Sequence, residues 1–503
     1  MSGAEGIITT SDSYYDYAIR SGFFRFNYDY AGKYILEVSG RYDGSSKFPK
    51  KSRFAFFPSF SVAWNATEED FLAGSRRWLN QLKPRFSYGS IGNQNSAGNY
   101  DYIATMGFNT KATTWLAGTD EGYVTSLTAP GLVSAGFTWE TITTMNAGLD
   151  FALFGNRLTG TFEWYQRDTK DILSASVQLP SILGTSAPNQ NVGSLRTRGW
   201  ELSLNWRGSF AQDKGRYGIG LNLWDYTSKI TKINFNEGNS LDLLYVGKTV
   251  GEIWGYVWDG FYTVDDFEDL GTWKLKEGVV SVDGISPRPG DYKFKNLRDN
   301  QARDEEVGVI NSGNNSLEKP GDRKIIGNGT PHYQYGITLS AGYGGFDLSV
   351  MLQGVGKRDY MGTSELFYTF NSGDAKWYPV FEGTTNYWKP VSTDPEDPNY
   401  MVAANPNATL PRIYGEIGNG AYNRRNNTHM LSDASYLRIK NLTLSYTFPK
   451  RWMNQISVSN LRAFVSMENL ATFSKLPRGI DPELLTWSYP LYRTTSFGLN
   501  LTF

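Results

Sequence analysis

Apolar and polar residues alternate along much of this chain with a period of two. The last stretch shows the pattern plainly, because Ser496, Gly498, Asn500 and Thr502 fall between large apolar residues. In an extended strand, successive side chains point to opposite faces, so this stretch predicts a strand with one apolar face. We expect it to be the strand that guides assembly, with an apolar face formed by Phe497, Leu499, Leu501 and Phe503.

The same alternation recurs from residue 20 onward and predicts about 13 strands. Short turns separate some of them, at Ala31-Gly32, Gly155-Asn156 and Gly344-Gly345. Long connections separate others, above all residues 228–331 and 354–433. Alternation of short and long connections is typical of outer-membrane β-barrels, whose short turns are periplasmic and whose long loops are extracellular.

Two stretches depart from the pattern. Residues 68–82 begin with acids and carry leucines on a loose stripe, which predicts a short helix. In residues 436–448 the apolar face from Leu442 to Phe448 would also direct Arg438 and Lys440 toward lipid. Either a bulge near Asn441 changes the phase, so that Leu437 and Ile439 face outward, or the upper part of the strand stands above the membrane.

Composition agrees with a barrel. The 503 residues have a net charge of -1, 15% aromatic residues, 53 glycines and no cysteine. The balanced charge argues against nucleic acid as a partner, and the lack of cysteine excludes disulfides and thiolate chemistry. The mean hydropathy is -0.43, and we find no apolar run of the ~20 residues that a spanning helix needs. A barrel needs no such run, because only alternate residues face lipid.

Motifs for catalysis are weak. The two histidines, His332 and His429, lie where predicted strands meet loops, which indicates residues of the barrel rim rather than a zinc site or a triad. Gly247-Lys248-Thr249 looks like part of a phosphate loop, but Asp242 stands where its first glycine is required. No spacing singles out a pair of carboxylates for glycoside hydrolysis. We therefore predict neither an enzyme nor a metal or cofactor.

Aromatic residues gather in the long connections that are predicted to be extracellular. Their faces could contact sugar rings or the apolar surface of a lid protein, and their polar edges could form hydrogen bonds. The alternative is that the rings pack the loop onto the barrel wall. The candidates for substrate or lid contact are Trp254, Tyr256, Trp258, Tyr262, Trp377, Tyr387 and Trp388.

A series of short motifs in a fixed order resembles the C-terminal half of the SusC/RagA family of TonB-dependent outer-membrane transporters from Bacteroidetes. The motifs are 41–46 (RYDGSS), 82–89 (LKPRFSYG), 191–194 (NVGS) with 198–201 (RGWE), 255–256 (GY) with 259–261 (DGF), 289–291 (PGD), 322–323 (DR) with 326–328 (IGN), 345–349 (GFDLS), 433–441 (DASYLRIKN), and 489–490 (YP) with 493–494 (RT).

This resemblance implies an all-β transmembrane antiparallel barrel of about 22 strands. Residues 1–503 would be its C-terminal portion, and the plug, the TonB-contacting segment and the first strands would lie outside this chain. The implied partners are an N-terminal half with a plug, a SusD-like surface lipoprotein, TonB acting through that plug, and outer-membrane lipid. The implied substrate is an oligosaccharide or a peptide.

The family often carries an Asp-x-Asn-Gly-Asp-Gly stretch after Pro-Gly-Asp, and this chain differs there. Residues 297–301 read LRDNQ and an insertion follows as far as Lys319. The glycine and the regularly spaced oxygen ligands of a calcium loop are missing. We expect a solvated acidic loop rather than a calcium site.

These observations predict a nutrient importer in the outer membrane of a Gram-negative bacterium. A passive porin or a surface adhesin is the alternative, and a secreted carbohydrate-active enzyme or binding module is the third. Residues 1–6 (MSGAEG) lack the basic start and apolar core of a signal peptide. Because an odd strand count cannot close a barrel of this kind, we expect the chain to be a piece of a longer protein or half of a split one.

Overall fold

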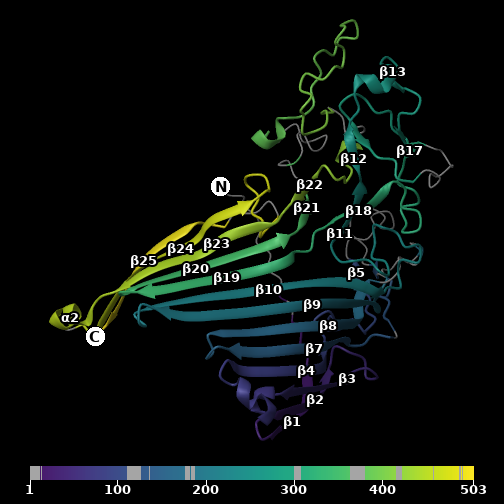
Figure 1. The fold of residues 1–503 in the computed structure, drawn as a ribbon. Coiled ribbons are helices and arrows are strands. Elements are labelled where there is room, and N and C mark those ends of the chain that lie inside the picture. Colours follow the sequence, from purple (N-terminus) through teal and green to yellow (C-terminus); the bar gives the residue numbers. More distant parts are fainter. Residues whose placement is uncertain are drawn as a thin grey trace.

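A single large antiparallel sheet dominates the computed structural model (Figure 1). The structure describes residues 12, 14–109, 126–127, 129–134, 136–175, 180, 182, 187–298, 308–362, 367, 380–414, 422–456, 458–485, 489 and 491–503. The sheet has 13 strands, which confirms the predicted number. In their order of pairing they are β1 (Ile19–Tyr30), β2 (Tyr34–Ser45), β3 (Phe54–Trp64), β4 (Leu79–Asn93), β7 (Glu140–Leu153), β8 (Leu158–Ala175), β9 (Asn189–Phe210), β10 (Gly215–Lys232), β19 (His332–Tyr343), β20 (Phe346–Lys357), β23 (Tyr436–Thr447), β24 (Asn460–Ser474) and β25 (Thr494–Thr502).

The short turns lie at one end of the sheet, together with the connections of residues 65–78 and 448–459, and the two longest connections lie at the other end. At Gly155-Asn156, φ is 69° and 63°, and at Gly344-Gly345 it is 60° and 93°. The loop at Gly344-Gly345 has two residues and the loop around Gly155-Asn156 has four, residues 154–157. Tight hairpin loops need positive φ, which glycine and asparagine adopt readily. The predicted turns and the two longest connections are confirmed.

One face of the sheet, here called the outer face, carries a continuous apolar band. Phe26 pairs with Val38, and Leu348 pairs with Leu444. Leu444 is 45% exposed although its strand, β23, is paired on both sides. The polar residues of the same strands line the opposite face, here called the inner wall. Since an apolar face of this size is unfavourable in water, the outer face is built to contact hydrocarbon.

A β-bulge explains the strand that did not fit the alternation. In the pairing of β23 with β20, Asn441 lies opposite Met351 and Ile439 lies opposite Leu352, so Lys440 is an extra residue. The bulge shifts the phase, and Leu437 and Ile439 share the outer face with Leu442. Of the two alternatives, the bulge is the correct one.

The predicted helix at residues 68–82 is wrong in type and length. The structure has two short 3₁₀ helices, η1 (Ala66–Glu68) and η2 (Asp70–Ser75), and β4 already begins at Leu79. Leucines on a loose stripe are an ambiguous signal, because a strand that pairs with two neighbours uses them equally well. Residues 79–82 form part of a strand because β4 pairs with β3 on one side and with β7 on the other.

The sheet is open in this chain. β1 and β25 lie at its two edges, and each pairs with one neighbour among the described strands. Every residue of β1 is exposed, as are eight of the nine residues of β25. Within the described residues, the helices are too short or too polar to cross a membrane.

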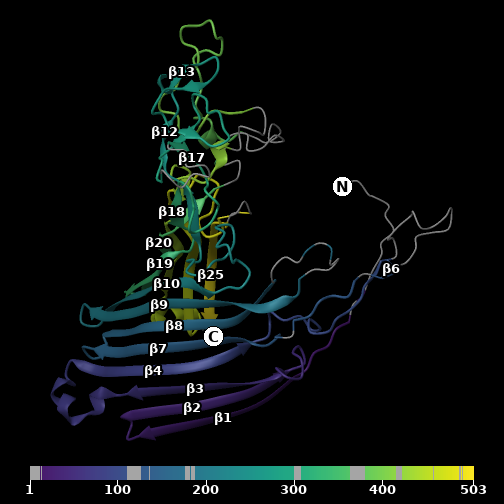
Figure 2. The same cartoon turned by 90° about the vertical axis from the view of Figure 1, so that its right-hand side faces the viewer.

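The two longest connections form a layer of small sheets that rises above one end of the large sheet (Figure 2). We call it the cap and define it as residues 233–298, 308–331, 358–362, 367, 380–414 and 422–435. Its paired strands are β11 (Glu252–Tyr256) with β18 (Arg323–Asn328), β12 (Trp258–Phe261) with β16 (Tyr292–Phe294), β13 (Phe267–Asp269) with β14 (Lys274–Leu275), β15 (Ser281–Val282) with β17 (Val309–Ile310), and β21 (Asp359–Met361) with β22 (Leu431–Asp433).

The remaining elements are short. They comprise β5 (Phe108–Asn109), β6 (Ser126–Leu127), η4 (Val264–Asp266), η6 (Glu382–Thr384), η7 (Tyr422–Arg424), α2 (Lys450–Met453) and η8 (Asn454–Ile456). A second small core of Phe48, Phe57, Phe137 and Trp139 packs the connections above β2, β3, β4 and β7. These connections are therefore held by packing and not only by their ends.

Candidate functional site: the cap and the inner wall

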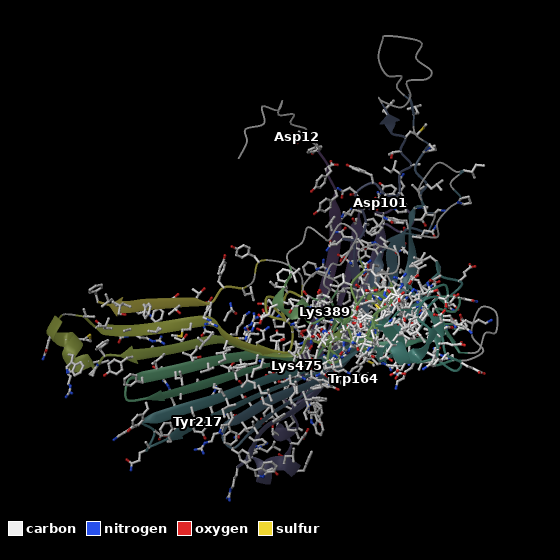
Figure 3. The ribbon with its side chains drawn as sticks, turned by 90° about the horizontal axis from the view of Figure 1, so that it is seen from above. Asp12, Asp101, Trp164, Tyr217, Lys389 and Lys475 are labelled. Carbon is white, nitrogen blue, oxygen red and sulfur yellow. The ribbon has the colours of Figure 1, made fainter. Side chains whose placement is uncertain are left out.

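The cap has an aromatic core of its own. Tyr292 is 0% exposed, Phe294 1% and Ile310 0%, and the rings of Tyr256 and Phe294 stack with centroids 5.0 Å apart. Tyr422 and Met430, from the second long connection, complete the same cluster. Because both connections contribute to one core, the cap is a folded layer over the strand ends. Viewed from above, side chains crowd around Lys389 and Lys475, while Tyr217 lies out along the sheet (Figure 3).

Asp291 ties the two connections together. Its carboxylate accepts hydrogen bonds from the backbone N–H of Arg288 (2.8 Å), the hydroxyl of Tyr414 (2.6 Å) and Nδ2 of Asn423 (2.8 Å). Burial raises the pKa of Asp291 above its usual range, although these donors oppose the shift. The preceding Gly290 has φ of +89°, and the indole of Trp388 lies where a Cβ would be. The Pro-Gly-Asp motif is thus a structural junction of the cap.

Asp322 is a second buried carboxylate, and it binds the loop for which no calcium site is predicted. It is 0% exposed and accepts hydrogen bonds from the backbone N–H of Leu297 (2.8 Å) and of Asn311 (2.9 Å). The guanidinium of Arg298 donates to the carbonyls of Gly321 (2.7 Å) and Arg323 (2.6 Å). A protein cation therefore lies among these oxygens. Residues 299–301, the rest of the LRDNQ stretch, lie outside the described residues.

Three of the seven aromatic candidates are buried. Tyr256 is 5% exposed, Tyr262 0% and Trp388 4%. The hydroxyl of Tyr262 donates to the carbonyl of Val280 at 2.6 Å, and burial raises its pKa. In this chain these rings pack within the cap itself, whereas the alternative interpretation expected them to pack onto the barrel wall.

Three other candidates are partly exposed. Trp254 donates from Nε1 to Glu252 at 2.9 Å, Trp258 packs against His429 with ring centroids 4.1 Å apart, and Lys389 lies over the ring of Tyr387. Trp377 lies outside the described residues. The contact of these residues with a substrate or a lid stays a prediction.

The inner wall carries charges of both signs. Arg85 pairs with Asp150 at 3.2 Å and with Glu163. Nearer the short turns, Arg207, Arg216 and Arg462 line a cavity of about 500 Å³ together with Asp347. A polar, charged wall of this kind suits a water-filled or protein-filled lumen and could not face lipid.

An ion-pair cluster fastens the last long connection to the inner wall. Arg438, only 2% exposed, binds Asp481 at 2.8 Å and Glu483 at 3.0 Å, and Lys440 binds Glu483 at 3.0 Å. The bulge in β23 places both basic residues where they can reach this loop. Sequence reasoning did not identify the two acids, although two basic residues inside an otherwise lipid-facing strand were a usable signal.

Comparisons with known proteins agree with the fold. Residues 2–470 match the family model described as TonB dependent receptor-like, beta-barrel. The chain is 30% identical to TonB-dependent receptor P3 of Formosa agariphila, over 99% of this chain and 47% of that protein. It is 29% identical to TonB-dependent receptor SusC of Bacteroides thetaiotaomicron, over 96% of this chain and 43% of that protein. The chain thus spans about half the length of the curated relatives it matches.

Among solved structures, the RagAB peptide transporter superposes with a TM-score of 0.72 at 23% identity. The match covers 97% of this chain and 48% of that one, and it supports the fold. Proteins of this family are transporters of the Gram-negative outer membrane and not enzymes. With a family match over most of its length, a 13-stranded sheet and an apolar outer face, this chain belongs to the TonB-dependent receptor-like β-barrel family.

Proposed function

We propose that residues 1–503 are the C-terminal portion of a barrel that imports a nutrient oligomer, either an oligosaccharide or a peptide, with energy supplied through TonB. The observation that carries this proposal is the cap, a folded layer that stands over a charged inner wall. A barrel that only let small solutes diffuse would not need a packed layer of this size above its mouth. RagAB, which has a similar fold, is described as a peptide transporter.

The proposal includes partners. An N-terminal half would supply the plug and the remaining strands, because β1 and β25 leave backbone groups unpaired that lipid cannot satisfy. TonB would act through that plug, and a SusD-like lipoprotein would close over the cap. The partly exposed rings of Trp254, Trp258 and Tyr387 would contact the substrate or this lid, as would Trp377.

Uptake by intact cells tests the proposal. Cells with the complete protein receive labelled oligosaccharides and labelled peptides graded by size, in the presence and absence of TonB. We expect uptake of one class that needs both the protein and TonB. Uptake that persists without TonB would indicate a passive porin, and cell adhesion without uptake would indicate an adhesin.

A substitution in the cap tests whether the cap takes part in uptake. Tyr387→Ala is expected to lower uptake severalfold at an unchanged amount of protein in the outer membrane, and Lys214→Gln, in the β9–β10 turn, serves as control. Equal uptake by both variants would remove Tyr387 from the contact surface.

A further inference from the structure

A trough runs along β24 on the outer face. The register places Ala463 between Tyr446 of β23 and Leu499 of β25, and it places Val465 between Leu444 and Phe497. Small side chains therefore form a floor between two ridges of large ones. The groove has a volume of about 700 Å³, and its lining is mainly apolar.

The trough does not depend on the open edge of the sheet. Both ridges and the floor come from three strands that already pair with one another, so a further strand beside β25 would leave the trough in place. Its ridges are well exposed, with Phe497 at 79% and Leu499 at 67%. Hydrocarbon covers this face in the membrane, and a groove between ridges favours a chain that lies along it.

The foot of the trough is basic. Tyr446 contacts the ring of Phe448 at a centroid distance of 5.0 Å, and α2 begins two residues later (Figure 1). In α2, Trp452 is 46% exposed and the guanidinium of Arg451 lies over its ring at 5.8 Å. Among the described residues, neither Lys450 nor Arg451 has an ion-pair partner.

The position of α2 fits a lipid headgroup. It belongs to the connection of residues 448–459, at the same end of the sheet as the short turns, and this end of outer-membrane barrels faces the periplasm. Exposed tryptophans mark the level of the headgroups, and basic residues at that level attract anionic lipids by about 1 kcal/mol each. An apolar trough thus ends at two unpaired positive charges beside an interfacial tryptophan.

We propose that the trough and α2 form a binding site for one anionic phospholipid of the periplasmic leaflet. One acyl chain lies along β24 between the ridges, and the phosphate lies against Lys450 and Arg451. The site is independent of the transported substrate, so its failure would leave the proposed import function untouched.

Native mass spectrometry of the complex extracted from outer membranes tests the site. The delipidated complex is titrated with phosphatidylglycerol, with phosphatidylethanolamine of the same acyl chains, and with glycerol 3-phosphate as a soluble headgroup. We expect phosphatidylglycerol to bind most tightly and glycerol 3-phosphate to compete poorly. Lys450→Gln with Arg451→Gln should weaken phosphatidylglycerol binding by about fivefold for each charge removed, and should weaken phosphatidylethanolamine binding less, because its ammonium group offsets the charge of its phosphate.

Filling the trough tests its apolar part. Ala463→Phe should weaken the binding of both lipids, and Ala463→Leu provides a second variant if the first assembles poorly. Two matched controls are Lys214→Gln, in the β9–β10 turn, and Val62→Phe, in a second trough of about 460 Å³ between β2 and β4. Both controls should keep the preference for phosphatidylglycerol.

Three results would overturn the site. Equal binding of the two lipids by the unchanged protein would remove the headgroup contact, and so would unchanged binding after both basic residues are replaced. Competition by glycerol 3-phosphate as strong as that by the lipid would show that the trough contributes nothing.

Discussion

Hydrogen bonds and ion pairs of a few single buried charged residues hold the cap and the last long connection in place. Asp291, Asp322 and Arg438 are each 2% exposed or less. A buried charge is stable only when it is paired or hydrogen-bonded, and removal of one partner leaves the other uncompensated. Each of these residues is therefore a point where one substitution should have a large and local effect.

Arg438→Met should release the loop that carries Asp481 and Glu483. Breaking a buried pair costs about 3 to 5 kcal/mol, because two carboxylates lose their partner. Limited proteolysis of the assembled protein should then cut within residues 475–493. Lys475→Gln is the control, since its pair with Asp433 is exposed and should contribute less than about 1 kcal/mol. Equal protection in both variants would show that Arg438 does not hold the loop.

Asp291 should make the stability of the cap depend on pH. Burial raises its pKa in the folded state, so the folded protein binds the proton more tightly than the unfolded chain. The cap should therefore lose stability as pH rises from the unfolded pKa of about 3.9 through the folded pKa. In thermal unfolding measured across this range, Asp291→Asn should be less stable at every pH but should show a smaller decline. An unchanged decline would mean that another group causes it.

Within a strand, the effect of a substitution depends on the face of the sheet on which the residue lies. Leu348 and Leu499 lie on the outer face, whereas their neighbours Ser349 and Asn500 lie on the inner wall. One step along a strand therefore separates a lipid contact from a lumen contact.

Leu499→Lys or Leu348→Lys should impair assembly more than Asn500→Lys or Ser349→Lys. A lysine on the lipid face costs roughly 2 to 4 kcal/mol at the midplane, and a lysine on the inner wall meets a polar lumen. The amount of heat-modifiable protein in outer membranes measures the difference. Equal amounts for the paired variants would reverse our assignment of the faces.

At the scale of the whole molecule, the two open edges of the sheet have the largest effect on membrane insertion. Each unpaired backbone group in hydrocarbon costs several kcal/mol, and a full strand edge presents many such groups. The cap and the inner wall are polar or buried, so these edges are the principal obstacle to insertion of this sheet by itself.

Produced alone, the 503-residue chain should fail to form a heat-modifiable species in the outer membrane. Production together with an N-terminal half that supplies the remaining strands should restore it, because both edges are then paired. Electrophoresis of unheated and heated samples provides the measurement. A heat-modifiable species from the chain alone would show that the edges are satisfied in another way, such as by a second copy.

Much of this architecture was readable in the residues themselves. Alternation with a period of two fixes which side chains share a face, as in Phe497, Leu499 and Leu501, and this period follows from the geometry of a strand. Turns such as Gly155-Asn156 can be recognised in the sequence, because few residues tolerate positive φ. The strand number, the apolar outer face and the position of the long connections all follow from such local rules.

Contacts between distant segments were decided by the tertiary structure. The phase of β23 depends on a bulge at Lys440, which is fixed by its neighbours β20 and β24 and by acids some forty residues away. Tyr256 and Tyr262 became core residues of the cap because a second connection folds onto the first. A sequence pattern records the preferences of one segment, whereas burial and pairing belong to two segments at once and exist only after the chain has brought them together.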